Sequence, residues 1–504
     1  MKLALIFNPF KYKMHEENLR IVQKYFGLFP PLSLAWAAAI AEKAGHTVRI
    51  IDARTLGLSP ESTIKLLRKF KPDALGFMVT TYMFPDTLQW IKAIKKQINV
   101  PVIVGGYNLR VYPQDSIAHE EIDFGIIEQA YYTLPALLIE LEKGTKRFAK
   151  VPGLAFKENG RIIITEHPQK IIFDEFPNPA RHLLPNELYA EFPTERKNFT
   201  VMITSLGCPF ECVFCEAGRT EYNARSPQTV IKEIEECYHD YSVREIDIFD
   251  YEFTGIRARV SEICRLLIEK KLDIVWSCRS RVDTVDEELL KQMYTAGCRR
   301  IYFGVESGVQ DILDRMNKKQ KIRQIIDTIK CCRKLGVKTL GFFLVGAPGD
   351  TKKTIRKTLN FAKKLDLDYV QFSKCLAKPK TELWEELVKK EKKDYWQDWI
   401  LGKVSDAQMS RPWTELSNEQ IDKLTKWAYI SYYLRFRFII KALFNIGSWY
   451  EFKRKLCALI DMIFSQESLS RVDDKFYAFN ENSEALILKA RNNLENSMRC
   501  DMSD

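Results

Sequence analysis

Short apolar runs alternate with amphipathic helical stretches along the first three quarters of this chain. In residues 1–145 the apolar runs are KLALIFN, TVRIIDA, ALGFMVT, PVIVGG and DFGIIE. Strands that are apolar on both faces and are joined by helices are typical of a parallel sheet covered on both sides. The start of the chain therefore predicts a doubly wound, Rossmann-like α/β domain, whose ligands bind beyond the carboxyl ends of its strands. No G-x-G-x-x-G follows the first strand, which disfavours a nicotinamide dinucleotide as that ligand.

A second series of strand and helix units begins at residue 200. Its expected strands are VMITS (201–205), IDIFDYEF (246–253), DIVWSCR (273–279), RRIYFGVES (299–307), KTLGFFLVGA (338–347) and YVQFSKCLA (369–377). Six units are too few for a closed eight-stranded barrel, so they predict an open, partial (β/α)6 barrel. Functional groups in such a barrel follow the carboxyl ends of the strands.

At 504 residues the chain is long enough for two to four domains. The pattern divides it into a doubly wound domain (1–145), a linker with a small ribbon (146–199), the partial barrel (200–385) and a helical C-terminal region (386–504). The N-terminal MKLALIFNPF lacks the long apolar core and the cleavage site of a signal peptide, and no run of about 18 uncharged apolar residues follows. We therefore expect a cytoplasmic protein, in which thiols stay reduced and are available as metal ligands.

The positive charge of the chain is concentrated near its C-terminal end. The net charge is +11 in total, and the window 423–455 alone carries eight Lys or Arg against one Glu. Helical periodicity in this window places five apolar residues on one face, namely Trp427, Ile430, Leu434, Phe438 and Ala442. Such a helix either packs its aromatic face on the mouth of the barrel or lies on an anionic membrane surface, as a peripheral contact through residues 423–455. The local excess does not favour nucleic acid as a partner.

The stretch SLGCPFECVFCEAG, at 205–218, contains three cysteines spaced C-x3-C-x2-C. They are Cys208, Cys212 and Cys215, and none of the 12 cysteines of the chain precedes them. They follow the first barrel strand directly, at the face where functional groups are expected. A zinc site usually has a fourth protein ligand or a water, and iron–sulfur clusters usually have four thiolates. Three thiolates suit a [4Fe–4S] cluster in which one iron is left open to a substrate.

This motif, with the aromatic Phe214 before its last cysteine, resembles the signature of the radical S-adenosylmethionine (SAM) enzymes, and the resemblance extends over about 200–385. It implies a [4Fe–4S] cluster whose open iron chelates SAM. It also implies a SAM-binding role for Phe214. In WSCRSRVD (276–283), YFGVESGVQDIL (302–313) and GFFLVGAPGDT (341–351) it implies SAM-binding roles for three more residues: Arg281 at the carboxylate, Glu306 at the ribose and amino acid, and Gly346 on the adenine side. Leu206, Asp350 and PKT (379–381) depart from the family pattern without touching the cluster ligands.

Residues 1–145 resemble the cobalamin-binding domain that precedes the barrel in many radical SAM enzymes. The resemblance rests on AGHTVRIIDA, PDALGFMVTT and VPVIVGGYN, and it implies a cobalamin site at Thr80, Thr81, Gly105 and Gly106. The two glycines would let a bulky ligand approach the backbone, although they could equally form a tight turn at the end of a strand. The D-x-H-x-x-G motif is missing, so the cobalt should lack a histidine ligand from the protein (His-off). IEQAYYT (127–133) replaces the family's GEGE-like turn and loses both glycines.

The combined resemblance, over about 1–385, implies a cobalamin-dependent enzyme that methylates an unactivated carbon of a small or lipid-like molecule, with an electron donor such as flavodoxin or ferredoxin. The anaerobic magnesium-protoporphyrin monomethyl ester cyclase type has the same cofactors and oxidises instead of methylating, and the cofactor motifs cannot separate the two. A tRNA methylthiotransferase is disfavoured because no cysteine precedes Cys208. A non-enzymatic corrinoid or iron–sulfur carrier would have no use for an open iron.

The other nine cysteines are scattered along the chain. We expect those in helical patterns to pack in the core as small apolar side chains. Cys278 and Cys375 lie at the ends of strands, and we expect them to face the cleft.

Overall fold

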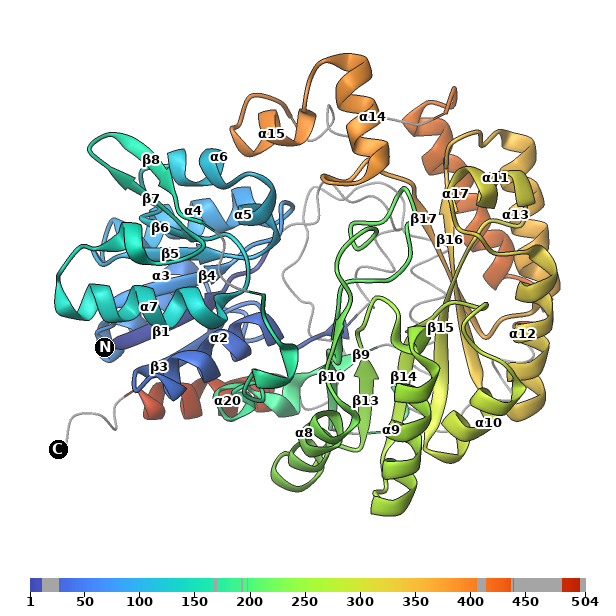
Figure 1. The fold of residues 1–504 in the computed structure, drawn as a ribbon, viewed down its shortest axis with the longest axis horizontal. Coiled ribbons are helices and arrows are strands. Elements are labelled where there is room, and N and C mark those ends of the chain that lie inside the picture. Colours follow the sequence, from blue (N-terminus) through green and yellow to red (C-terminus); the bar gives the residue numbers. More distant parts are fainter. Residues whose placement is uncertain are drawn as a thin grey trace.

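The structure is a computed structural model of the chain, and Figure 1 shows two α/β halves joined side by side. It describes residues 1–10, 27–166, 170–191, 194–196, 198–405, 414–436, 438 and 483–498. Among the helices in these ranges, none is both long enough and apolar enough to cross a membrane.

The first half contains a seven-stranded sheet in the order β3-β1-β4-β5-β6-β7-β8. Its first five members in space are parallel and match the five predicted strands: β3 (Thr47–Asp52), β1 (Lys2–Phe7), β4 (Ala74–Met78), β5 (Val102–Gly105) and β6 (Phe124–Ile126). Side chains of β1 alternate between two cores. Leu3, Leu5 and Phe7 lie in one, and Ala4 and Ile6 lie in the other. This alternation explains why the strand is apolar throughout, since both faces are covered.

Helices cover both faces of this sheet (Figure 1). On one side α2 (Leu32–Lys43) packs against α7 (Ala130–Lys143), and on the other α3 (Pro60–Phe70) packs against α4 (Phe84–Lys95). Two short helices, α5 (Tyr107–Val111) and α6 (Pro113–Ala118), follow β5.

The ribbon predicted in the linker is a hairpin of β7 (Leu154–Glu158) and β8 (Arg161–Ile164). It does not stand apart from the first sheet, as the prediction of a linker over 146–199 implied. β7 pairs antiparallel with β6, with Leu154 opposite Ile126, so the sheet continues past residue 145. The pairing covers the edge of β6, whose backbone groups would otherwise be open. Asn159 and Gly160 both have positive φ, which suits the tight turn between the two strands.

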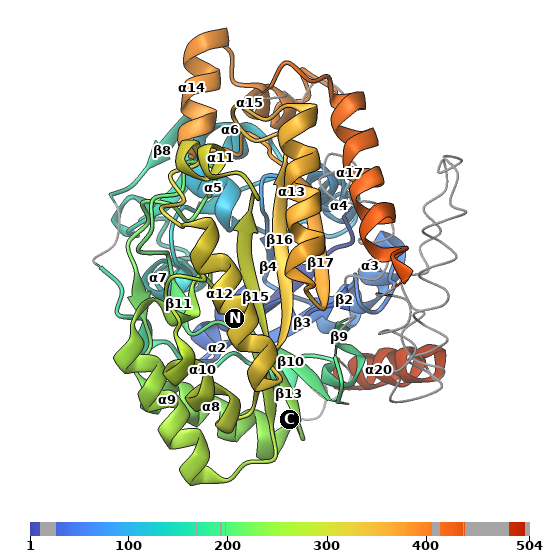
Figure 2. The same cartoon turned by 90° about the vertical axis from the view of Figure 1, so that its right-hand side faces the viewer.

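The second half contains six parallel strands in the order β10-β13-β14-β15-β16-β17, as the sequence predicts. They are β10 (Phe199–Met202), β13 (Glu245–Ile248), β14 (Val275–Ser280), β15 (Cys298–Glu306), β16 (Lys338–Val345) and β17 (Tyr369–Lys374). The outer face carries α8 (Pro227–Asp240), α9 (Arg257–Lys270), α10 (Glu287–Thr295), α12 (Ile322–Leu335) and α13 (Lys352–Leu365), which enclose the larger core (Figures 1 and 2). The short helix α11 (Gln310–Arg315) follows β15.

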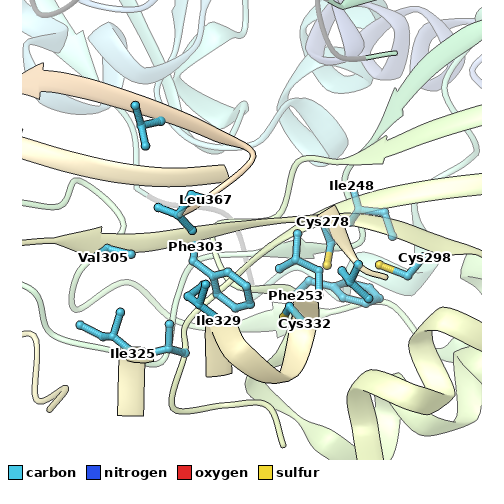
Figure 3. Close-up of a cluster of buried hydrophobic side chains, with 14 of the residues drawn as sticks. Ile248, Phe253, Cys278, Cys298, Phe303, Val305, Ile325, Ile329, Cys332 and Leu367 are labelled. Carbon is cyan, nitrogen blue, oxygen red and sulfur yellow. The ribbon is translucent and has the colours of Figure 1, made fainter. Parts of the chain in front are cut away.

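Figure 3 shows Cys278, Cys298 and Cys332 inside this core, beside the rings of Phe253 and Phe303. The prediction that Cys278 and Cys375 face the cleft is therefore wrong, because both belong to the apolar core. On β14 the neighbours Ser277 and Arg279 both reach Asp247 on the opposite, inner face. Side chains alternate along a strand, so Cys278 between them must point to the helix layer.

Small elements connect the two halves. Two short pairs are antiparallel, β2 (Gly27–Leu28) with β9 (Ala190–Glu191) and β11 (Ser205–Leu206) with β12 (Asn223–Ala224). Five 3-10 turns are η1 (Phe148–Lys150), η2 (Phe173–Glu175), η3 (Arg181–Leu183), η4 (Asn186–Leu188) and η5 (Phe253–Gly255). The helical C-terminal region contains α14 (Glu382–Glu391), α15 (Tyr395–Ile400), α17 (Asn418–Tyr433) and α20 (Ser483–Ser497).

Two of these C-terminal helices return to the first half. In α15, Trp396 and Trp399 belong to the first domain's own core, and Gln397 donates to Asp115 at 3.0 Å. In α20, Arg491 donates to the carbonyl of Leu56 at 2.7 Å. The C-terminal region is therefore shared between the two halves.

Helix α17 lies along β17, the edge strand of the second sheet (Figure 2). The hydroxyl of Tyr429 accepts a hydrogen bond from the backbone amide of Phe372 at 3.0 Å. The hydroxyl of Tyr433 accepts the amide of Val370 at 3.0 Å and donates to its carbonyl at 2.8 Å. Tyrosine hydroxyls thus satisfy backbone groups that a seventh strand would satisfy in a closed barrel.

The predicted packing of this helix needs correction. Most of the helix covers the edge of the sheet, and its buried side chains are Ile421, Thr425, Ala428, Tyr429 and Tyr432. Of the predicted face, Trp427 is 41% exposed and Leu434 is 38% exposed, while Ala442 lies outside the described residues. The prediction considered only apolar side chains. The open edge of β17 also has unpaired backbone groups, and side chains with hydroxyls can form hydrogen bonds with them. Most of the window proposed for membrane contact, 439–455, also lies outside the described residues.

Replacing Tyr429 with phenylalanine should lower the free energy of unfolding by about 1–3 kcal/mol, because it leaves the buried amide of Phe372 without an acceptor. Tyr131→Phe is a matched control, since that hydroxyl donates to the carbonyl of Glu175 at an exposed site. Urea unfolding of the two variants measures the difference. Equal stability of both variants would contradict the role given to the Tyr429 hydroxyl.

Candidate functional site

The cysteine loop follows β10 and β11 at the carboxyl-terminal edge of the second sheet. It folds back on itself through two backbone bonds, from the amide of Cys215 to the carbonyl of Cys212 (3.1 Å) and from Gly218 to Cys215 (2.9 Å). A Cβ on Gly218 would lie 2.8 Å from the carbonyl oxygen of Cys212, so only glycine fits there. Gly207, with φ +72°, similarly has no room for a Cβ beside the carbonyl of Glu221. These glycines let the chain wind closely around the three thiols.

The three thiols are half-buried. Burial raises the pKa of Cys208 to about 11 and also raises that of Cys215. Two backbone amides oppose this effect, from Phe210 to Cys208 and from Ala217 to Cys215, because a hydrogen bond to sulfur favours the thiolate. Within the described ranges, no three His, Cys, Asp or Glu side chains gather as ligands of one metal ion. An all-thiol donor set with amide donors and a glycine-lined loop fits an iron–sulfur cluster.

Arg281 comes from the end of β14 and lies against the cysteine loop, only 5% exposed. Its Nη1 donates to Sγ of Cys212 at 3.6 Å, and its guanidinium lies 3.9 Å from the centre of the Phe210 ring. Asp283 accepts from Nε at 2.9 Å and from Nη2 at 2.7 Å. Within the chain the carboxylate partner of Arg281 is Asp283, and the predicted contact of Arg281 with the SAM carboxylate stays a prediction.

Glu306 ends β15 in a left-handed conformation, with φ +62°. That conformation is strained for a residue with a Cβ, and such strain is often found at functional sites. Its carboxylate forms a buried ion pair with Lys318, at 3.0 Å. Burial acts to lower the pKa of Lys318, but Glu306 and then Cys212 outweigh it, and the pKa is raised. Lys318 also lies 5.9 Å from the ring of Phe214, so Glu306 and the cysteine loop share one cation.

Gly346 follows β16 with φ +83°, and its amide donates to Asp350 at 3.1 Å. A Cβ on Gly346 would lie 2.9 Å from the side chain of Ile421 on α17. The turn and the packing of α17 therefore both require a glycine at this position, whatever it binds.

The carboxyl-terminal edges of the two sheets face each other. Tyr82, after β4, donates to Glu216 at 3.5 Å, directly beside Cys215. Tyr107, after β5, donates to the carbonyl of Pro379 at 2.9 Å, and Tyr112 donates to Asp394 at 2.8 Å. The ligand edge of the first domain thus lies against the cysteine loop of the second.

Comparison with known proteins identifies both halves. Residues 202–362 match the Radical SAM superfamily model, and residues 20–138 match the B12 binding domain model. The chain is 34% identical over 423 residues to Uncharacterized methyltransferase PH0819 of Pyrococcus horikoshii, covering 82% of this chain and 90% of that protein. This chain belongs to the cobalamin-binding radical SAM family. It is an enzyme whose cofactors are a [4Fe–4S] cluster, SAM and cobalamin.

Two further comparisons agree with this family. The chain is 28% identical to the anaerobic magnesium-protoporphyrin IX monomethyl ester cyclase of Rubrivivax gelatinosus, over 72% of this chain and 67% of that protein. The solved structure of the cobalamin-dependent SAM radical enzyme OxsB has the same fold, with a TM-score of 0.68 at 17% identity, covering 99% of this chain and 78% of that one.

The residues predicted to hold cobalamin lie at the carboxyl ends of β4 and β5. The Thr81 side chain is buried, and its Oγ1 has no hydrogen-bond partner among the described residues. The side-chain oxygen of Asn108, just after Gly106, is also buried without a described partner. Such orphaned groups fit a polar ligand at this edge. Thr80 is half-buried beside them.

The two glycines at this edge differ in what the structure requires of them. Gly106 has φ +113°, and a Cβ there would lie 2.5 Å from the carbonyl oxygen of Val79, so the fold itself requires glycine. A Cβ on Gly105 would make only an ordinary contact, 3.6 Å from Ile126. The role of both glycines in binding cobalamin stays a prediction, as do the SAM-binding roles of Phe214, Arg281, Glu306 and Gly346.

Two residues at the cluster edge were not singled out from the sequence, Lys318 and Glu252. Glu252 follows β13 and is 1% exposed, and its Oε1 accepts from the Thr254 hydroxyl at 2.6 Å and from the Thr284 hydroxyl at 3.1 Å. Burial raises its pKa to about 7. The sequence could have indicated Glu252 as a functional residue, because DYEF directly follows a barrel strand.

The Glu252 carboxyl should make the stability of the cluster-free chain depend on pH. Its pKa rises from 4.5 to about 7 on folding, so the folded state holds a proton that the unfolded state releases between these values. Stability should therefore fall as pH rises through this window, by up to roughly 3 kcal/mol relative to Glu252→Gln. Urea unfolding of both proteins from pH 4.5 to 8 tests this expectation, and a constant difference across the range would contradict it.

Proposed function

We propose that this protein is a cobalamin-dependent radical SAM methyltransferase that acts on an unactivated carbon of a small molecule. The observation that carries the proposal is the contact between Tyr82 and Glu216. This contact joins the first domain to the cysteine loop, and it supports an arrangement in which one substrate reaches both cofactors. The relative from Pyrococcus horikoshii, which is named a methyltransferase, supports the same reaction class.

When bound, the cluster and SAM supply a 5′-deoxyadenosyl radical, and cobalamin supplies the methyl group. The chain's own residues hold and shield these groups. Cys208, Cys212 and Cys215 would ligate the cluster, and Thr81 and Asn108 offer unpartnered polar atoms to cobalamin. Tyr107 joins the two edges through its hydrogen bond to the carbonyl of Pro379.

The mass of the product tests the reaction type. Protein reconstituted anaerobically with cluster and cobalamin would be incubated with SAM carrying a deuterated methyl group and with small-molecule fractions of a cell lysate. We expect a product heavier by one labelled methyl, formed together with 5′-deoxyadenosine. A product that loses hydrogen or gains oxygen would instead assign the cyclase reaction of the Rubrivivax relative. Failure of the loaded protein to cleave SAM would favour a carrier.

We also propose that cobalamin binds without a histidine ligand from the protein. In the described part of the first domain, His46 directly precedes β3 and His119 precedes β6. His46 therefore lies at the amino-terminal edge, opposite Thr81 and Gly106. The ring of His119 packs against that of Phe84 at the start of α4, with 5.4 Å between the centroids, so the proposal rests on the missing D-x-H-x-x-G motif. Electron paramagnetic resonance of the Co(II) form tests this proposal. We expect no nitrogen superhyperfine splitting, and a clear nitrogen triplet would contradict it.

The electron donor we propose is a flavodoxin or a ferredoxin. A one-electron donor is needed because the cluster must be reduced before SAM is cleaved. Replacing dithionite with reduced flavodoxin or ferredoxin should sustain 5′-deoxyadenosine formation. If dithionite supports 5′-deoxyadenosine formation and neither reduced flavodoxin nor reduced ferredoxin does, the proposal is contradicted.

A peripheral membrane contact is proposed for the surface near α17. Trp427 is 41% exposed and Phe436 is 80% exposed, and Lys363 lies 6.0 Å from the Trp427 ring. Exposed aromatic residues beside lysines suit an anionic bilayer surface. Flotation with phosphatidylglycerol vesicles should carry the protein upward, and Phe436→Ser should reduce the floated fraction. No flotation at low salt would contradict the contact.

A further inference from the structure

Arg281 is held in place by contacts within the chain. Asp283 binds it through two hydrogen bonds of 2.9 and 2.7 Å, and the backbone carbonyl of Lys318 accepts from Nη2 at 2.5 Å. Asp283 is itself held by Gln320, which donates to it at 2.9 Å. The ring of Phe210 supports one face of the guanidinium. These contacts come from three separate segments, so the group has little freedom to turn away.

The nitrogen that remains, Nη1, points at Sγ of Cys212 at 3.6 Å. Cys212 is the middle one of the three predicted cluster ligands. A hydrogen bond from a cation to a thiolate offsets negative charge on that ligand. The reduced form of a cluster carries one more electron than the oxidised form, so a nearby cation stabilises the reduced form more. Hydrogen bonds to cluster sulfurs are one of the protein's means of setting the reduction potential.

We propose that Arg281 is a positioning residue that raises the reduction potential of the [4Fe–4S] cluster through its contact with Cys212. In this step the donor is oxidised and gives one electron to the cluster, which is reduced from its 2+ to its 1+ state. This proposal concerns the cluster and not methyl transfer, so its test is independent of the reaction type. It also differs from the predicted contact of Arg281 with the SAM carboxylate.

The test is a potentiometric titration of the reconstituted full-length protein without SAM, followed by electron paramagnetic resonance. Arg281→Gln keeps a polar side chain but removes the charge, and Arg281→Lys keeps the charge without the guanidinium fork. Arg279→Gln is the matched control. Arg279 lies two residues earlier, on β14, and its charged partner is Asp247, at 3.1 Å.

We expect Arg281→Gln to shift the reduction equilibrium about tenfold towards the oxidised cluster, which is about 59 mV more negative for one electron. Arg281→Lys should recover part of the shift, and Arg279→Gln should leave the potential unchanged. An unchanged potential in Arg281→Gln at full iron content would overturn the proposal. Loss of the cluster from both Arg281 variants, with native far-ultraviolet circular dichroism, would also overturn it and assign Arg281 to cluster assembly.

Discussion

Replacing Cys212 with alanine should abolish the [4Fe–4S] cluster and, with it, all cleavage of SAM. The loop offers three thiols in eight residues, and the fourth iron is left for the cosubstrate, so no spare ligand exists within the motif. Cys278, Cys298 and Cys332 cannot replace it, because they are enclosed in the apolar core (Figure 3), and Cys331 lies on the outer helix layer. Iron and sulfide content after anaerobic reconstitution measures the loss, and 5′-deoxyadenosine measures the activity.

Cys331→Ala is the control for this experiment. Cys331 is half-buried on α12, on the outer helix layer, and its loss should leave iron content and SAM cleavage unchanged. Full cluster content in Cys212→Ala would refute the assignment of the three ligands. Equal loss in both variants would mean that reconstitution depends on thiols in general.

Replacing Glu233 with alanine should lower the free energy of unfolding by about 3–5 kcal/mol. Glu233, on α8, is 1% exposed and pairs with two fully buried arginines. Arg181 donates to its Oε1 at 2.7 Å, and Arg225 donates to its Oε2. Removing this carboxylate leaves two buried cations without their shared anion, which costs more than the lost bonds alone.

Glu235→Ala is the matched control for this variant. Glu235 lies on the same helix and forms a surface ion pair with Lys270 at 2.7 Å. A surface pair contributes at most about 1 kcal/mol, so the control should stay close to the wild type. Urea unfolding followed by circular dichroism compares the two variants. A loss of under about 1 kcal/mol in Glu233→Ala would show that the buried triad of Glu233, Arg181 and Arg225 is not needed for stability.

The same triad shows what periodicity could not reveal. Arg181 lies in the segment that the sequence indicates as a linker, yet its guanidinium reaches the interior of the barrel half and also donates to the carbonyl of Val201 at 2.9 Å. The hairpin β7–β8 likewise completes the first sheet. A segment without strong periodicity predicts a connection, but here such segments cover an unpaired strand edge and pair with a buried carboxylate.

The features of the candidate site also fall into those that a short stretch of sequence predicts and those that only the fold reveals. The cysteine motif, its place after the first barrel strand and the glycines at both edges are local features, readable in windows of a few residues. Asp283 is a local partner of Arg281, two residues away, but Cys212 lies 69 residues away and Lys318 lies 37 residues away. Only the folded chain shows that Nη1 of Arg281 points at a predicted cluster ligand.

The sequence by itself determined two series of strand and helix units and one three-thiol loop, because strand and helix periods and ligand spacing are encoded by neighbouring residues. Tertiary structure alone decided which edges needed covering and which charges needed partners. It placed the tyrosines of α17 on the open edge of β17, turned Cys278 into the core and set Tyr82 beside the cysteine loop. The physical reason is that burial and backbone hydrogen bonding are satisfied by residues far apart in the chain, which no local pattern records.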